Sequence, residues 1–256
     1  MPLPRDYISY NQIRVYLSCP KQYYYSYIEE IKTPINDKVL LGIIFHSSVD
    51  FYLKRKISGD LPDFKETEEF FISRFNSFVS STDIIWKEIK DKVLKRGLAM
   101  IRHFISYIAP KLNPIMTEKE LVTEIPESNI KIKGVIDLIE DDFSITDFKT
   151  TTSKWSKKRV DNALLQLYIY KYLFEMNMKG TSINQLKFSI LFSKNESNVR
   201  HQEFVINSRD ADFTKMHSII DHVAEGIKKE LFFKNEGYIC NMCNYKDICR
   251  KSSLKV

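Results

Sequence analysis

Glycine and proline are scarce in this chain of 256 residues, which contains 7 glycines and 8 prolines. Together they amount to about half of the share of roughly 12% that is average for proteins. Flexible linkers are rich in these residues, so the sequence leaves little room for a long one. The hydrophobic share of 43% and the charged share of 28% are typical of globular proteins. We therefore expect one domain, rich in helix.

Long hydrophobic runs are missing as well. The longest apolar stretch, residues 39–45, is far shorter than the roughly 18 residues of a membrane span. The opening residues, MPLPRDYISY, lack the apolar core of a secretory signal. We expect an intracellular, cytoplasmic protein without membrane association.

Cysteine is also sparse, because four cysteines are too few for a disulfide scaffold in a chain of this length. Their positions are more informative than their number. Cys240, Cys243 and Cys249 lie within ten residues, and Cys19 stands alone near the other end. Tetrahedral zinc and an iron-sulfur cluster both require a fourth ligand, which Cys19 can supply. The spacing alone leaves both groups open.

No charge of one sign dominates, since the net charge is only +6, and this value does not by itself imply a nucleic-acid partner. One local segment is more suggestive, because it places an aromatic ring among cations. It could hold phosphates and stack a base, although a solvated loop before a helix is an equal alternative. Its residues are Lys154, Trp155, Lys157, Lys158 and Arg159.

The hydrophobic periodicity changes along the chain from helical to strand spacing and back. Ser9 and Gln12 form a capping-box pattern that begins the first helix. We predict helices at residues 10–18, 37–57, 65–81, 83–109, 160–178 and 209–234. We predict strands at residues 121–125, 130–139, 143–149, 185–192 and 203–206.

Two carboxylates interrupt apolar strands of this predicted sheet. Asp137 lies in Val-Ile-Asp-Leu-Ile, and Asp147 shares one strand face with Lys149. Carboxylates on adjacent strands can hold Mg²⁺, and a nearby lysine can stabilise charge during phosphodiester hydrolysis. The alternative is an exposed hairpin with solvated acids.

A shared site sets a condition on the loop between the two strands. Asp137 can oppose Asp147 only across a loop with an odd number of residues, such as 141–143, or across a bulge. A two-residue turn at 141–142 would instead set Asp137 opposite Thr146. We therefore predict a three- or five-residue loop or a bulge.

Other polar residues have ordinary readings when taken singly. His46, one turn after Gly42 in the helix predicted at 37–57, resembles a hydrogen-bonded core histidine. Gln166 and Tyr170 share one face of the following helix, which is consistent with helix packing.

Taken together and in order, these motifs resemble the PD-(D/E)XK nuclease superfamily, specifically its RecB-like branch. The matching segments are GIIFH ending at His46, GVIDLI around Asp137, ITDFKT around Asp147 and Lys149, and QLYIY from Gln166 to Tyr170. The resemblance implies a restriction-endonuclease-like α/β core with a mixed β-sheet flanked by helices.

The resemblance also implies a role for each motif residue. His46, Asp137 and Asp147, with the backbone carbonyl of Phe148, would bind Mg²⁺ or Mn²⁺. Lys149 would be the catalytic lysine. The catalytic set that it implies consists of Asp137, Asp147, Lys149, Gln166 and Tyr170.

The cysteines extend the resemblance to nearly the whole chain. Cys19 followed by Pro-Lys-Gln-Tyr-Tyr, together with the C-terminal C-x2-C-x5-C, resembles the 4Fe-4S form of RecB-like nucleases, as in CRISPR-associated nucleases, AddB subunits and exonuclease V. The implied cluster, formed by Cys19, Cys240, Cys243 and Cys249, would join the N- and C-terminal segments. Zinc is the alternative.

We therefore predict a Mg- or Mn-dependent deoxyribonuclease, most plausibly an exonuclease on single-stranded DNA ends. The alternatives are a CRISPR spacer-processing nuclease with integrase partners and a non-catalytic iron-sulfur DNA-binding module of a repair complex. The sequence contains no G-x-x-x-x-G-K-[ST] motif, so unwinding would need a helicase partner. Within one domain we expect an N-terminal segment (1–36), a nuclease core (37–207) with a helical insertion at about 60–115, and a C-terminal helix with the cysteine cluster (208–256).

Overall fold

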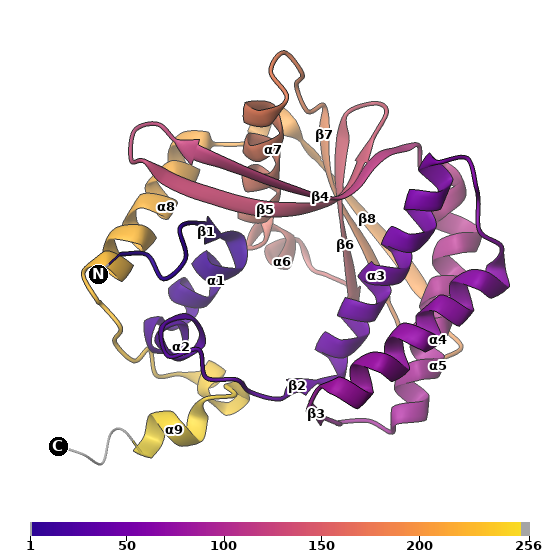
Figure 1. Ribbon diagram of the computed structural model, residues 1–256, viewed down its shortest axis with the longest axis horizontal. Coiled ribbons are helices and arrows are strands. Elements are labelled where there is room, and N and C mark those ends of the chain that lie inside the picture. Colours follow the sequence, from indigo (N-terminus) through magenta and orange to yellow (C-terminus); the bar gives the residue numbers. More distant parts are fainter. Residues whose placement is uncertain (1, 252–256) are drawn as a thin grey trace. The chain divides into compact units, whose positions relative to one another are not determined.

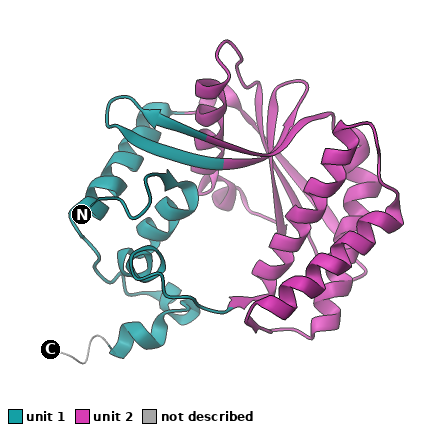
Figure 2. Cartoon of the chain, in the orientation of Figure 1, with its two compact units in different colours: residues 1–34, 122–134, 212–256 teal, residues 35–121, 135–211 magenta. Residues whose placement is uncertain are grey.

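The computed structural model describes residues 2–251, which form both helices and strands (Figure 1). The chain divides into two compact units (Figure 2). Unit 1 draws on residues 1–34, 122–134 and 212–256, and unit 2 consists of residues 35–121 and 135–211. The expectation of one domain stays a prediction, and the two units are described separately below.

A mixed sheet follows the strand order β1-β5-β6-β7-β8, and β4 (Pro114–Ile125) also pairs with β5. In unit 1, β1 (Ile8–Ser9) is parallel to the beginning of β5 (Ile130–Glu140). In unit 2, β5 is antiparallel to β6 (Ser144–Thr151), β6 is parallel to β7 (Gln185–Phe192), and β7 is antiparallel to β8 (Arg200–Asn207). The predicted mixed α/β fold is thereby confirmed.

The helices of unit 2 form its helical layer and bridge its parallel strands. α3 (Asp37–Ile57), α4 (Phe64–Ser81) and α5 (Lys90–His103) lie side by side (Figure 1). α6 (Lys157–Asp161) and α7 (Leu164–Asn177) connect β6 to β7, because parallel strands need a crossover. Asn36 caps α3 by accepting hydrogen bonds from the Lys38 and Val39 N–H groups.

One hydrophobic core joins this helical layer to the sheet within unit 2. Its aromatic centre includes Phe45, Phe71, Phe104 and Phe148, all fully buried. Phe104 meets Phe148 edge to face, with ring centroids 5.6 Å apart. The side chain of Phe148, which lies between Asp147 and Lys149 in the sequence, therefore anchors β6 in this core.

Unit 1 is assembled from both ends of the chain. α1 (Tyr10–Ser18) begins at Ser9, whose hydroxyl accepts from the Gln12 N–H, and α2 (Pro20–Tyr23) continues into a π-turn at Tyr24–Ile28. α8 (Phe213–Lys228) packs on α1. Tyr16 donates to the Leu231 carbonyl at 3.0 Å, and Tyr23 stacks on Phe232. Aromatic contacts between sequence-distant segments therefore hold this unit together.

Three predicted helices were wrong in extent. Residues 83–89 are not helical: they contain β3 (Ile84–Ile85), which pairs with β2 (Ile35–Asn36), and Asp37 accepts hydrogen bonds from the Lys87 and Glu88 N–H groups. The helix predicted at 160–178 is two helices, α6 and α7. The last helix ends at Lys228, because Glu230 adopts a left-handed conformation (φ 59°).

One long strand and several short helical segments complete the described chain. β4 (Pro114–Ile125) begins well before the predicted strand at 121–125, and short helical turns at Phe104–Ile108 and Ala109–Lys111 precede it. A turn at Tyr238–Met242 and α9 (Lys246–Lys251) end the described residues. In residues 2–251, the helices are too short or too polar to cross a membrane.

The tight contact at Gly97 yields a test of the helical layer. A Cβ there would lie 2.3 Å from Phe71 Cζ and 2.7 Å from Leu41 Cδ1, both in buried side chains. Gly97→Ala should lower the free energy of unfolding by about 1–2 kcal/mol, because overpacking outweighs the gain in helix propensity. Urea denaturation measures this. Lys92→Ala, an exposed change in the same helix, should stay within about 0.5 kcal/mol of wild type; equal stability of Gly97→Ala would contradict the packing.

Candidate active site

The β5–β6 hairpin brings the two predicted aspartates together. Its loop consists of the three residues 141–143, as predicted, and the register pairs Leu138 with Thr146 and Ile139 with Ile145. One further step of this register sets Asp137 opposite Asp147. Phe143 turns the chain with φ 57°, and Asn184 fixes the loop through the Phe143 and Asp142 carbonyls. The odd loop length therefore places both carboxylates on one face.

Three potential metal ligands from three elements of unit 2 converge beside this hairpin. The ligand atoms of His46, Glu118 and Asp137 lie within 4.8 Å of one another. His46 Nδ1 is 3.3 Å from Asp137 Oδ2 and 3.9 Å from Glu118 Oε1. These elements are α3, β4 and β5, so the group depends on the order of strands in the sheet.

Glu118 was missed by the sequence analysis. It lies in β4 with φ 44°, a left-handed conformation that interrupts the regular strand. Nearby, Thr117 donates to the Asp137 carbonyl at 2.9 Å and to Asp50 Oδ1 at 3.2 Å, which joins this part of β4 to the site. The polar residues around Glu118 give no periodic signal, because the local strand geometry is irregular.

A second group links β6 to α7. Lys149 Nζ lies 2.7 Å from Asp147 Oδ2 and donates to Gln166 Oε1 at 3.1 Å. The Gln166 amide in turn donates to the Tyr170 hydroxyl at 2.8 Å. Gln166 and Tyr170, one helical turn apart, thus hold the lysine amine from the helix side.

The three potential metal ligands line one open cavity of about 710 Å³ in unit 2, together with Lys149 and Tyr170 of the second group. Gly42 and Thr150 both line it, and a Cβ at Gly42 would lie 3.6 Å from the Thr150 hydroxyl. The polar lining combines carboxylates with cations and an imidazole, as a site for a metal ion and an anionic substrate requires. The lining residues include Lys38, His46, Asp50, Glu118, Asp137, Lys149 and Tyr170.

The buried charges shift one another's protonation. Burial opposes the imidazolium of His46, but the charge of Asp137 and hydrogen bonds with Asp137 and Glu118 raise the pKa of His46 to about 10. Burial likewise opposes ionisation of Asp137, yet His46 and Lys149 keep its pKa below the usual value. Burial raises the pKa of Asp147 to about 6, with Lys149 acting in the opposite direction. The two aspartates are therefore electrostatically distinct.

Asp147 and Phe148 make different contacts from His46 and Asp137, the other two predicted metal ligands. Asp147 is not part of the His46, Glu118 and Asp137 group, and its carboxylate faces Lys149 instead. The Phe148 N–H donates to Asp137 Oδ2 at 2.7 Å. A ligand role for Asp147 and for the Phe148 carbonyl stays a prediction.

The basic segment after β6 separates into an exposed and a buried part. Lys154, Lys157, Lys158 and Arg159 are exposed. Trp155, however, is only 7% exposed, packs on Phe188 at 5.5 Å and has the Arg159 guanidinium over its ring at 4.5 Å. The ring is therefore not available as an open stacking surface for a base, so we leave Trp155 out of the proposed nucleic-acid contacts.

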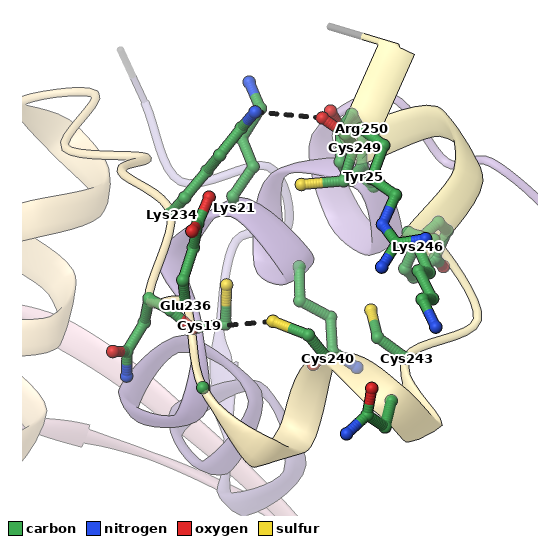
Figure 3. Close-up of a pocket in the computed structure, with 15 residues that line it drawn as sticks. Cys19, Lys21, Tyr25, Lys234, Glu236, Cys240, Cys243, Lys246, Cys249 and Arg250 are labelled. Carbon is green, nitrogen blue, oxygen red and sulfur yellow. Dashed lines mark hydrogen bonds between the residues drawn. The ribbon is translucent and has the colours of Figure 1, made fainter. Parts of the chain in front are cut away.

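The four cysteines meet in unit 1. Cys19, Cys240, Cys243 and Cys249 are free, half-buried, and line one cavity of about 320 Å³ (Figure 3). The cations Lys21, Lys234, Lys246 and Arg250 line the same cavity, where Glu236 is the acidic counterpart. Lys234 donates to the Cys249 carbonyl at 2.9 Å. Four sulfurs in a basic pocket form a donor set that suits a thiolate-bound metal group.

Comparisons with known proteins agree with this architecture. A protein from Eubacterium rectale, described as a “putative exonuclease”, aligns with a TM-score of 0.52 and 15% identity over 88% of this chain and 80% of its own; at this identity the likeness shows the fold. The protein SSO0001 aligns with a TM-score of 0.42 and 19% identity over 93% of this chain and 92% of its own. No curated protein matches the sequence.

The family comparison covers nearly the entire sequence. The model of the PD-(D/E)XK nuclease superfamily matches residues 7–250. This range includes the β5–β6 hairpin, Gln166 and Tyr170 of α7, and all four cysteines. This match agrees with the site of carboxylates, lysine and glutamine described above. The chain belongs to the PD-(D/E)XK nuclease superfamily.

Proposed function

We propose that this protein is a metal-dependent deoxyribonuclease that hydrolyses DNA from single-stranded ends. The observation that carries the proposal is the convergence of His46, Glu118 and Asp137 beside Lys149 in one open cavity. A metal ion beside a lysine suits phosphodiester hydrolysis, because both cations stabilise the negative charge that develops on the phosphate oxygens.

The donor set of the cavity fits a hard divalent cation. Two carboxylates and one imidazole offer oxygen and nitrogen ligands, which suit Mg²⁺ or Mn²⁺. Asp147, opposite Asp137 on the hairpin, is a further carboxylate within the same pair of strands. When bound, the cation supplies charge neutralisation at the phosphate and a more acidic water.

The residues of the chain position the remaining groups. Lys149 is held by Asp147 and Gln166, so its ammonium is fixed beside the cavity. There it can donate to a phosphate oxygen or orient the attacking water. The lysine ammonium can only donate, so it requires the Gln166 oxygen, and the Gln166 amide nitrogen then donates to the Tyr170 hydroxyl.

The preference for DNA ends rests on wider resemblances. The family implies a nucleic-acid substrate, and the described solved structure with the higher TM-score is a “putative exonuclease”. Exposed cations after β6 (Lys154, Lys157, Lys158 and Arg159) offer a surface for the strand backbone. Spacer processing with integrase partners, and the need for a helicase partner, stay predictions.

We further propose that Cys19, Cys240, Cys243 and Cys249 hold a 4Fe-4S cluster. In a tetrahedral zinc site the sulfurs would lie about 3.8 Å apart, as follows from the Zn–S bond length. Within residues 2–251, no three of the cysteine sulfurs all lie within 4.8 Å of one another. The cations around the cavity would balance the negative charge of four thiolates.

The central prediction concerns cleavage. Asp147→Ala or Lys149→Ala should lower the rate of DNA hydrolysis at least about a hundredfold, because each removes a group that acts on developing charge. End-labelled oligonucleotides with Mg²⁺ or Mn²⁺ measure the rate. Both variants should retain the cysteine-bound group, as seen in their visible absorbance. Full activity in either variant would overturn the proposed mechanism.

The same assay tests the mode of attack. Linear single-stranded DNA should be degraded, whereas closed circles of the same sequence should persist. Cleavage of the circles would identify an endonuclease and contradict the action on ends. Inactivity of the wild type on every DNA form, with Lys149 and Asp147 intact, would favour a non-catalytic binding module.

A second prediction concerns Glu118 and the protonation of His46. Because the pKa of His46 is raised to about 10, the imidazole is protonated at neutral pH and must lose its proton to become a ligand. Binding of Mn²⁺ should therefore release protons and weaken as pH falls. Calorimetry in buffers of different ionisation enthalpy measures both effects.

Variants assign this behaviour to the individual ligands. Glu118→Gln should raise the Kd for Mn²⁺ about tenfold or more, which corresponds to at least ~1.4 kcal/mol. Glu124→Gln, an exposed change in the same strand, is the matched control. Unchanged affinity in Glu118→Gln, or unchanged proton release in His46→Ala, would remove that residue from the site.

A third prediction concerns the cysteines. Cys240→Ser and Cys249→Ser should each abolish the brown absorbance of a 4Fe-4S cluster and lower the Tm, because the metal-bound thiolates join segments far apart in sequence. Visible absorbance, iron content and thermal unfolding provide the measurements. A colourless wild type with stoichiometric zinc would sink the iron-sulfur assignment.

A further inference from the structure

A second cavity of unit 2 adjoins the candidate active site. It has a volume of about 310 Å³, and we call it the arginine cavity. Three of its lining residues are cations, four are consecutive hydroxyl-bearing residues at the end of β6, and none is acidic. The lining consists of Lys38, Leu41, Arg96, Thr150, Thr151, Thr152, Ser153 and Arg159.

Arg96, which lines this cavity, has buried hydrogen-bond donors without an acceptor. The residue is 2% exposed, and its Nη1 pairs with the Glu88 carboxylate at 2.7 and 2.9 Å. Its Nε and Nη2 are buried and have no hydrogen-bond partner among residues 2–251. A guanidinium does not lose its proton, so two donors remain without an acceptor, which is costly.

The chemistry of the lining selects a tetrahedral oxyanion as the missing acceptor. Nε and Nη2 lie on one edge of the guanidinium and match two oxygens of a phosphate. The hydroxyls of Thr150, Thr151, Thr152 and Ser153 add neutral donors. Lys38 and Arg159 supply two further positive charges.

The position of the arginine cavity ties it to the substrate of the active site. Lys38 and Thr150 line both cavities, and Thr150 directly follows Lys149. Phosphates recur at every nucleotide of a strand. A strand whose scissile phosphate lies at Asp137 and Lys149 can therefore place another phosphate in the neighbouring cavity.

We infer that the arginine cavity binds a second phosphate of the substrate strand, one that is not hydrolysed, with Arg96 as its principal ligand. The inference rests on the proposed nuclease function and adds a site that sets the register of the strand. The phosphate is either a terminal monoester or an internal diester, and both present the same oxygens to Arg96.

An internal ion pair is the structural alternative. Asp37 Oδ1 is also buried without a partner in the described chain, while Asp37 Oδ2 holds the segment that carries Glu88. If Arg96 served only Glu88 and Asp37, its loss would reduce stability without changing nucleic-acid binding. The experiment therefore measures both quantities.

The test compares the affinity of the full chain for single-stranded oligonucleotides in the absence of divalent cations, where no cleavage occurs. Arg96→Met, which keeps the side-chain volume, should raise Kd about tenfold and reduce the slope of log K against log salt by about 0.7. Arg159→Gln and Thr151→Val, which change two other lining residues, should also weaken binding. Lys92→Gln, an exposed cation of the same helix as Arg96, is the matched control and should leave Kd unchanged.

Three otherwise identical oligonucleotides distinguish the source of the phosphate. They carry a 5′-phosphate, a 3′-phosphate or no terminal phosphate. A larger effect of Arg96→Met on one phosphorylated end identifies a terminal monoester, and equal effects identify an internal diester. Inorganic phosphate should compete with the strand in wild type and not in Arg96→Met.

These measurements can contradict the inference about Arg96 without contradicting the proposed nuclease function. Unchanged Kd and salt slope in Arg96→Met, Arg159→Gln and Thr151→Val would overturn the inference even if the wild type cleaves DNA. If Arg96→Met is poorly folded, the other two variants decide. Equal losses of stability in Arg96→Met and Glu88→Gln, with binding intact, would assign Arg96 to the internal ion pair. A wild type that binds through Arg96 yet never cleaves would instead refute the nuclease proposal alone.

Discussion

The antiparallel register of β5 and β6 is the constraint on which the candidate site depends. Side chains alternate between the two faces of a strand, so a shift of one residue would turn Asp147 and Lys149 away from Asp137. The three-residue loop fixes this register, and the left-handed Phe143 closes it. The buried Phe148 then anchors β6 in the core, while its N–H donates to Asp137. Phe148 therefore contributes both to the packing of the core and to the geometry of the candidate site.

The charges around the hairpin are arranged in two complementary pairs. Asp137 faces His46, and Asp147 faces Lys149. In a buried site each pair limits the cost of removing its charges from water. The pairs also place candidate metal ligands and a fixed ammonium side by side, which is a suitable environment for a phosphodiester. The geometry therefore reconciles the burial of two carboxylates with an open cavity.

Much of the local structure could be predicted from sequence. The periodicity indicated α1, α3 and α4 to within a residue, and a capping pattern marked the start of α1, because these signals are local along the chain. The helix predicted to begin at residue 83 was wrong for residues 83–89. The Lys87 and Glu88 N–H groups there donate to Asp37, some 50 residues away. Local propensity contains no information about such a partner.

The sequence by itself determined the family, through the order of its motifs, and the parity of the hairpin loop, through the alternation of side chains. It also isolated four cysteines as one candidate ligand set. Only the tertiary structure decided that Glu118 joins His46 and Asp137, that Trp155 is covered by Arg159, and that Arg96 is buried with free donors. These three facts depend on which distant elements lie next to one another, and sheet order and helix packing set that proximity.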